Sequence, residues 1–406
     1  MVFSGGGARG AYEAGVIRYL VDELAPRLGH PLAMDVLCGT SVGAIHACYL
    51  AGTADQGPGR GVSLVDFWRA MRVQEVLPFS TRDMLGLARR LFGLRRIANA
   101  FRVGRAPDRL YGLLDTRALE RLVVRAVPWL SIHRNVVAGR VGAVCVAATE
   151  LATGRVVVFM DTADRELPGW SRDPQLVPRI TRLRPTHALA SAAIPLLFPV
   201  VRIASTYYGD GGLRLNTPLS PAVRLGADRV LVIALRMSSG ASHTTATHKV
   251  EDYASPAFLF GKVLNSLMLD HIDTDLARMR DMNELIRDGE RAFGPDFLAR
   301  LGAAREDAHE PRRIIEELVI RPSADLGVLA GTVLRDLPDA ALRSPFFRLA
   351  LRNLVEQDGR SAEADLLSYL LFDGEFLDPL AELGYRDARA KEEELARFFT
   401  DGGTST

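Results

Sequence analysis

The sequence Cys38-Gly39-Thr40-Ser41-Val42-Gly43-Ala44 decides the fold of the N-terminal part of the chain. An apolar run, 33–38, precedes it, and a second apolar run at helical spacing, 42–51, follows it. This order predicts a strand, a sharp turn and a helix. A serine in such a Gly-x-Ser-x-Gly turn is held clear of its neighbours, as a nucleophile must be, while Gly39 and Gly43 let the backbone bend. The motif alone is also typical of an ordinary strand-to-helix turn.

A glycine-rich loop lies upstream of this turn. Residues 1–4 are apolar and predict a short strand, Gly5-Gly6-Gly7-Ala8-Arg9-Gly10 follows, and an apolar stripe over 11–24 predicts a helix. Residues 1–50 therefore alternate between strand and helix. Such an alternation predicts a parallel sheet that is covered by helices.

Two interpretations compete for the glycine loop. Gly5-x-Gly7-x-x-Gly10 fits the dinucleotide-binding fingerprint, which requires an acidic residue at the end of the second strand. The second strand ends in Cys38-Gly39-Thr40-Ser41 and offers no carboxylate there. The other interpretation is an oxyanion hole, because successive N–H groups at the start of a helix favour negative charge. We favour it, since loops after adjacent parallel strands emerge at the same edge of a sheet. The predicted oxyanion residues are Gly5, Gly6, Gly7, Ala8, Arg9 and Gly10.

Asp210 is the second singular position in the sequence. It lies in Gly209-Asp210-Gly211-Gly212, directly after a hairpin predicted from 199–203 and 206–208. Asp-Gly is the commonest signal of a hairpin turn. The continuation over 213–219 is not hairpin-like, and this favours a carboxylate that a tight loop, with Gly211 and Gly212, presents to Ser41.

Composition excludes several classes of protein. The chain has 406 residues, of which 48% are hydrophobic and 24% charged, and its formal net charge of +1 argues against a nucleic-acid binder. Its three cysteines have no metal-ligand spacing and predict buried free thiols in a reducing compartment. No apolar run reaches the length of about 18 residues that a membrane span requires. We expect a cytoplasmic protein with no signal peptide, no metal and no cofactor.

The remainder of the chain predicts an insertion and an extension. Residues 60–110 hold eleven arginines against four acidic residues, with leucine and phenylalanine interspersed. They predict a basic amphipathic insertion, which is either a lid, a contact with anionic lipid at the inner membrane face, or a helical cap with solvated arginines. Residues 236–250 resemble a linker, 251–400 are expected to be mainly helical, and 401–406 are expected to be disordered.

Three motifs together resemble the patatin-like phospholipase family in order and spacing. They are Gly5-Gly6-Gly7-Ala8-Arg9-Gly10, then Gly39-Thr40-Ser41-Val42-Gly43, then Asp210-Gly211-Gly212. The stretch Ala190-Ser191-Ala192-Ala193-Ile194-Pro195 is also similar to the family's pattern. The resemblance covers about residues 1–235, and the helical remainder is similar to C-terminal extensions of bacterial members.

The resemblance implies a three-layer α/β/α sandwich with a mainly parallel sheet and a catalytic Ser-Asp dyad without a histidine. It makes Ser41 the nucleophile, Asp210 the base, and the N–H groups around Gly6, Gly7 and Ala8 the oxyanion hole, with Arg9 at the family's basic position. The implied activity is hydrolysis of glycerolipid carboxylic esters through an acyl-enzyme, without cofactor or metal. The implied catalytic domain is 1–235, with the insertion at about 60–125 and the extension 251–400 packed on the core.

Three alternatives stay open from the sequence. His271 and His309 follow Asp210 in the chain order of an α/β-hydrolase, so a Ser-His-Asp triad is one of them. A membrane-associated scaffold without activity is the second. The third is acyl transfer to an acceptor other than water, which shares the acyl-enzyme step. The oligomeric state and the lipid class are not determined by the sequence.

Overall fold

The computed structural model has a central sheet in which β1 (Val2–Phe3) is the middle of five consecutive parallel strands. This strand lies between β2 (Val36–Thr40) and β9 (Arg229–Ile233), and it is parallel to both. β10 (Glu316–Ile320) continues the parallel sheet beyond β9, and β4 (Ala143–Glu150) continues it beyond β2. The structure describes residues 1–73, 109–110, 116–163, 174–195, 197–237, 272–303, 312–336 and 368–400.

The sheet becomes mixed beyond β4. β5 (Val156–Thr162) and β8 (Thr206–Asp210) both pair antiparallel with β4. β7 (Val200–Ile203) forms a hairpin with β8, as the sequence predicted, and the two-residue β3 (Arg109–Leu110) pairs with β7. β6 (Leu176–Ile180) is parallel to β5. The central sheet is thus mainly parallel, with an antiparallel part that carries Asp210.

Strands β2 and β8 lie end to end along the same edge of β4. The last residue of β2, Thr40, pairs with Ala147, and the last residue of β8, Asp210, pairs with the next residue, Ala148. β2 runs parallel to β4 and β8 runs antiparallel to it, so their C-terminal ends meet. The register of β4 therefore brings the turn after Thr40 and the loop after Asp210 together.

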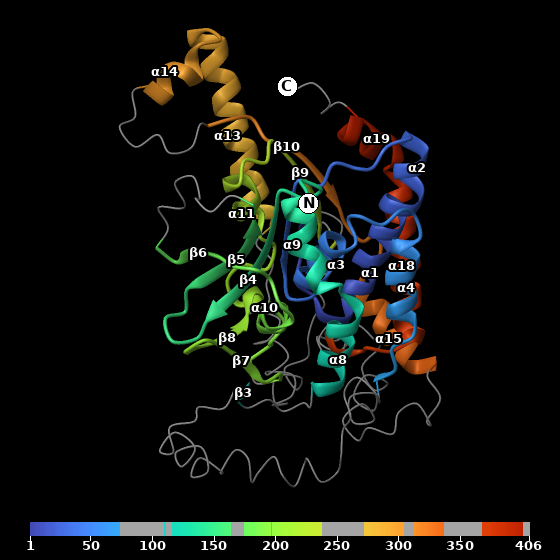
Figure 1. Ribbon diagram of the computed structural model, residues 1–406. Helices are drawn as coiled ribbons and strands as arrows, with labels where there is room; N and C mark the ends of the chain where they lie inside the picture. Colours follow the sequence, from blue (N-terminus) through green and yellow to red (C-terminus); the bar gives the residue numbers. More distant parts are fainter. Residues whose placement is uncertain are drawn as a thin grey trace, which may run out of the picture.

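Helices cover both faces of the sheet, because neighbouring strand residues point to opposite faces. Phe3, Leu37 and Val146 belong to a core beneath one layer of helices, and Val2 and Cys38 to a core beneath the other. The first layer contains α1 (Gly10–Tyr19), α3 (Val42–Gly52), α4 (Arg60–Arg69), α9 (Trp129–Val137), α10 (Pro185–Ser191) and α18 (Gly374–Ala390). The second contains α11 (Leu219–Arg224) and α13 (Ile272–Phe293). The three-layer α/β/α fold is confirmed (Figure 1).

The C-terminal helix α18 is part of the first layer and lies beside α1 and α4 (Figure 1). Arg18 of α1 donates to Glu382 at 2.9 Å, and Tyr12 of α1 donates to Asp387 at 3.0 Å. Arg69 at the end of α4 donates to Glu382 at 2.7 Å. Other helical segments are a π-helical turn (Leu20–Leu24), α2 (Ala25–Leu28), α8 (Arg117–Ala126), α14 (Phe297–Ala303), α15 (Leu326–Asp336) and α19 (Glu392–Thr400).

Two elements differ from what local sequence patterns favour. Val136 and Val137 are β-branched, which favours strands, but they end helix α9, where Ile132 and Val136 are buried one turn apart. Strand β6 was not predicted, and its Pro178 is compatible with its position at the margin of the sheet. Most of the predicted basic insertion (74–108), most of the linker (238–250) and the tail (401–406) lie outside the described residues.

Candidate active site

Ser41 occupies a sharp turn between β2 and α3. Its backbone has φ 55° and ψ −123°, a region that residues other than glycine seldom adopt. The turn is tight: a Cβ on Gly39 would overlap the carbonyl of Gly43, and a Cβ on Gly43 would lie 2.6 Å from the carbonyl oxygen of Phe3. Both flanking positions therefore require glycine. A strained backbone that the surrounding fold enforces is common at functional sites.

The Ser41 hydroxyl is hydrogen bonded to Asp210. Ser41 Oγ donates to Asp210 Oδ2 at 2.8 Å, and the backbone N–H of Gly212 donates to Asp210 Oδ1 at 2.7 Å. Ser41 is 4% exposed and Asp210 1%. Burial raises the pKa of Asp210 to about 7, against the opposing effect of the two hydrogen bonds from Gly212 and Ser41. A carboxyl with such a pKa can accept or release a proton near neutral pH.

Four further hydrogen bonds hold this pair against strand β4 and the end of α10. Ser191 Oγ, at the end of α10, accepts from the N–H of Ser41 at 2.8 Å and donates to the carbonyl of Ala147 at 2.6 Å. Thr149 Oγ1 donates to the carbonyl of Asp210 at 2.8 Å. The N–H of Asp210 donates to the carbonyl of Ala193 at 2.8 Å. The backbones of Ser41 and Asp210 are thereby held on a rigid element.

The glycine loop lies directly beside Ser41. A Cβ on Gly5 would lie 3.2 Å from Ser41 Cβ and 2.5 Å from Asn216 Oδ1. The N–H of Gly5 donates to the carbonyl of Asn216 at 3.0 Å, and Asn216 Nδ2 donates to the carbonyl of Gly5 at 3.3 Å. Asn216 thus holds the start of the loop next to Ser41.

A short 3₁₀ helix, Gly7–Arg9, follows Gly5 and Gly6 and runs into α1. The backbone N–H of Arg9 donates to the carbonyl of Gly6, and the N–H of Gly10 donates to the carbonyl of Gly7. In the part of the chain that the structure describes, this pattern leaves the N–H groups of Gly6, Gly7 and Ala8 without a backbone partner. Free N–H groups at the start of a helix favour an anion.

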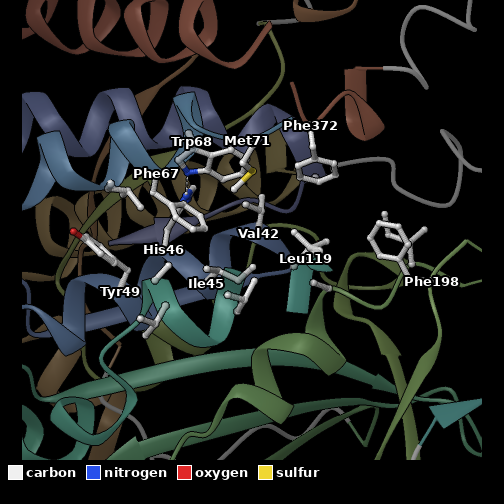
Figure 2. Close-up of a pocket in the computed structure, with 18 residues that line it drawn as sticks. Val42, Ile45, His46, Tyr49, Phe67, Trp68, Met71, Leu119, Phe198 and Phe372 are labelled. Atoms are coloured by element: carbon white, nitrogen blue, oxygen red, sulfur yellow. Dashed lines mark hydrogen bonds between the residues drawn. The ribbon is translucent and has the colours of Figure 1, made fainter. Parts of the chain in front are cut away.

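An apolar pocket, which Ser41 helps to line, lies between α3, α4 and α8 (Figure 2). On α3, Val42, Ile45 and Tyr49 line it at helical spacing. Figure 2 shows Phe67 and Trp68 of α4 facing this row and Leu119 of α8 on another side. Its other lining residues are Gly7, His46, Leu64, Met71, Val123, Ala126, Val127, Ala192, Ile194, Phe198 and Phe372.

His46 and Trp68, which line the pocket, form a buried polar chain with Glu13. Trp68 Nε1 donates to His46 Nε2 at 3.2 Å, so the proton of a neutral His46 lies on Nδ1, 2.7 Å from Glu13 Oε2. Burial lowers the pKa of His46 to about 3 and raises the pKa of Glu13 well above its usual range. His46 is therefore uncharged, and its contacts orient the indole of Trp68.

The structure brings most of the predicted site residues together. Beside Ala147 and Ala148 of β4, the structure brings together Ser41, Asp210 and Gly5. Gly211 and Gly212 follow directly after Asp210. Arg9 donates to Ser368, which lies in the C-terminal part of the chain, and Gly10 begins α1. His271 and His309 lie outside the described residues, and none of the described histidines, His30, His46, His133 and His187, is hydrogen bonded to Ser41 or Asp210.

Thr149 and Asn216 were not singled out from the sequence. Asn216 follows the Asp-Gly-Gly motif closely, and this position in the sequence could have marked it as a candidate site residue. No local pattern in the sequence marks Thr149, because its bond to the carbonyl of Asp210 depends on the pairing of β4 with β8. In the described part of the chain, no group of three or more His, Cys, Asp or Glu side chains is arranged to hold a metal ion, and no helix is long and apolar enough to cross a membrane.

Comparisons with known proteins identify relatives of this chain. The chain is similar to a cGAMP-activated phospholipase of Pseudomonas aeruginosa (strain BWHPSA011 / Pa011), with 27% identity over 221 residues, which are 54% of this chain and 53% of that protein. The matched part thus spans about half the length of that relative.

Among solved structures, VipD of Legionella pneumophila aligns over 98% of this chain and 88% of its own, at 11% identity and a TM-score of 0.28. The family model of the patatin-like phospholipases matches residues 1–223. The chain therefore belongs to the patatin-like phospholipase family.

Proposed function

We propose that this protein hydrolyses carboxylic esters of glycerolipids, with Ser41 as the nucleophile and Asp210 as the base. The observation that carries the proposal is the 2.8 Å hydrogen bond from Ser41 Oγ, which lines an apolar pocket, to the buried carboxylate of Asp210. A serine hydroxyl is a weak nucleophile until a neighbouring base accepts its proton. Asp210 is placed to accept it directly.

The reaction proceeds in two halves. As Ser41 Oγ bonds to the ester carbonyl carbon, its proton moves to Asp210 Oδ2. The bond to the alcohol then breaks, the alcohol takes this proton, and the acyl group stays on Ser41. In the second half water attacks the acyl-enzyme, passes a proton to Asp210, and releases the fatty acid as the proton returns to Ser41 Oγ. A pKa of about 7 suits a group that must gain and lose a proton in each half.

The carbonyl oxygen becomes negatively charged in each tetrahedral intermediate. The N–H groups of Gly6, Gly7 and Ala8 are the proposed donors to it, because they lack backbone partners in the described structure and belong to the loop that contacts Ser41. Loss of one such donor typically costs about 3 kcal/mol of transition-state stabilisation. Their supporting contacts therefore matter for the rate.

The pocket supports an acyl chain as the bound part of the substrate. Its lining side chains are almost all aliphatic or aromatic, and each buried methylene group stabilises binding by about 0.8 kcal/mol. Transfer of the acyl group to an acceptor other than water would use the same first half-reaction. Contact of residues 60–110 with an anionic membrane stays a prediction, since 74–108 lie outside the described residues.

The proposal is tested with a short-chain p-nitrophenyl ester and with phospholipid vesicles. Ser41→Ala and Asp210→Asn should each abolish hydrolysis. The matched control variants at exposed positions, Ser63→Ala and Asp66→Asn, should each leave hydrolysis unchanged. Full activity in either site variant would overturn the proposal. Vesicle binding that persists without any hydrolysis by the wild-type protein would support the scaffold instead.

A Ser-His-Asp triad is separated from this mechanism by replacing the eight histidines one at a time. An enzyme that uses Asp210 directly should retain hydrolysis in every variant that folds. Loss of activity on replacing His271 or His309, with unchanged thermal stability, would favour the triad.

A further inference from the structure

The glycine loop beside Ser41 is contacted by a segment more than 350 residues away in sequence. Residues 368–373, which we call the C-terminal clasp, precede α18 and lie outside the part that matches the family model. Arg9, the fifth residue of the loop, is 3% exposed. Its Nε donates to Ser368 Oγ at 2.7 Å, and its guanidinium lies 4.1 Å from the ring centroid of Tyr369 and donates to the Tyr369 hydroxyl at 3.3 Å.

The contact extends to the backbone of the loop. Gly7 has φ +56°, and a Cβ at this position would overlap the carbonyl oxygen of Tyr369. The clasp therefore lies against the residue whose N–H is a proposed donor to the oxyanion. Phe372, near the other end of the clasp, lines the pocket together with Ser41 and stacks on Trp68 at 6.3 Å between ring centroids.

The clasp is itself anchored at its far end. Asp373 accepts from the N–H of Val73 at 3.2 Å and from the N–H of Glu375 at 3.2 Å, where it caps α18. The N–H of Gly374 donates to the carbonyl of Met71. Since Tyr12 of α1 donates to Asp387 of α18, the helix after the clasp is bound to the helix after the loop.

We propose that the C-terminal clasp positions the oxyanion loop, with Ser368 and Tyr369 acting through Arg9. The inference rests on the proposed hydrolase function. It adds that residues outside the part that matches the family model complete the active site. Arg9 is a positioning residue here, because its guanidinium binds the clasp and its backbone belongs to the loop. A shift of about 1 Å in the loop N–H groups is enough to lower a rate on the order of 100-fold.

The test compares two arginines that each stack on a tyrosine. Ser368→Ala combined with Tyr369→Leu removes the clasp contacts of Arg9, whereas Arg18→Gln removes a salt bridge to Glu382 and a stack on Tyr385 at 4.7 Å, away from the loop. We expect the clasp variant to lose about 10- to 100-fold in kcat with KM changed less than about twofold, and the Arg18→Gln protein to keep its kcat. Tyr369→Phe, which keeps the ring over Arg9, should retain most of the activity.

Amide hydrogen exchange of peptides covering residues 3–11 provides a second measurement that needs no activity. Exchange should rise in the clasp variant and not in Arg18→Gln at matched melting temperature. Unchanged kcat and unchanged exchange in the clasp variant would overturn the inference. If the wild-type protein shows no Ser41-dependent hydrolysis, the proposed function fails, and the exchange measurement alone decides whether the clasp orders the loop.

Discussion

Asp210 pairs with Ala148 of β4 directly beyond the point where Thr40, the residue before Ser41, pairs with Ala147. The relative position of the two proposed catalytic side chains is therefore set by the register of one central strand. Ser191 reinforces it, because one hydroxyl bonds both the N–H of Ser41 and the carbonyl of Ala147. The proposed pair needs such support, and sites on strands are held more precisely than sites on loops.

The first prediction concerns the pH dependence of hydrolysis. Asp210 can accept the proton of Ser41 only when it is ionised, and its pKa is raised to about 7 by burial. The value of kcat/KM should therefore fall about tenfold per pH unit below this pKa and level off above it. The measurement is hydrolysis of an uncharged acyl ester between about pH 5 and pH 9. A constant rate down to pH 5 would contradict an Asp210 base with a raised pKa.

The second prediction concerns stability. The unfolded carboxyl loses its proton near 3.8 and the folded one near 7, so between these values the folded state holds more protons and the free energy of unfolding falls as pH rises. The shift corresponds to at most on the order of 4 kcal/mol. Asp210→Asn removes this penalty and can keep the hydrogen bond from Gly212. The variant should be inactive, yet more stable than the wild type at pH 8.

Chemical denaturation at pH 4 and pH 8 checks this expectation. The difference between Asp210→Asn and wild type should be small at pH 4 and large at pH 8, while the exposed Asp66→Asn should show no such dependence. An Asp210→Asn protein that is less stable than wild type at both pH values would show that ionised Asp210 stabilises the fold instead.

The third prediction concerns Ser191, which is fully buried. Ser191→Ala leaves the N–H of Ser41 and the carbonyl of Ala147 without this partner. Unsatisfied buried groups should lower the free energy of unfolding by about 1–3 kcal/mol, and a displaced Ser41 should lower kcat about tenfold. Ser220→Ala on α11, whose hydroxyl accepts from Arg224 at 3.0 Å, is the matched control. Wild-type kcat in Ser191→Ala would mean that the turn holds Ser41 without this bridge.

The sequence predicted those parts of the fold and site that depend on local patterns. The apolar runs around Ser41 and the glycine loop gave the strand–helix alternation, and the hairpin before Asp210 was also correct. The order of β4, β8 and β5 could not be predicted, because it depends on which strands pair across many residues. For the same reason the bridge by Ser191 and the contact of Arg9 with Ser368 have no local signal.

The fourth prediction concerns the length of the acyl chain. Ile45 lies one helical turn beyond Ser41 on α3, and its side chain lines the pocket between Val42 and Tyr49 (Figure 2). Ile45→Phe should fill the space that the middle of a long chain would use. If about three methylene groups lose their burial, kcat/KM for a twelve-carbon ester should fall by about 2 kcal/mol, or roughly 30-fold, while a four-carbon ester is affected little. Val124→Phe, at a position 46% exposed on α8, adds the same ring without lining the pocket. Equal losses for both esters in Ile45→Phe would mean that the acyl chain binds elsewhere.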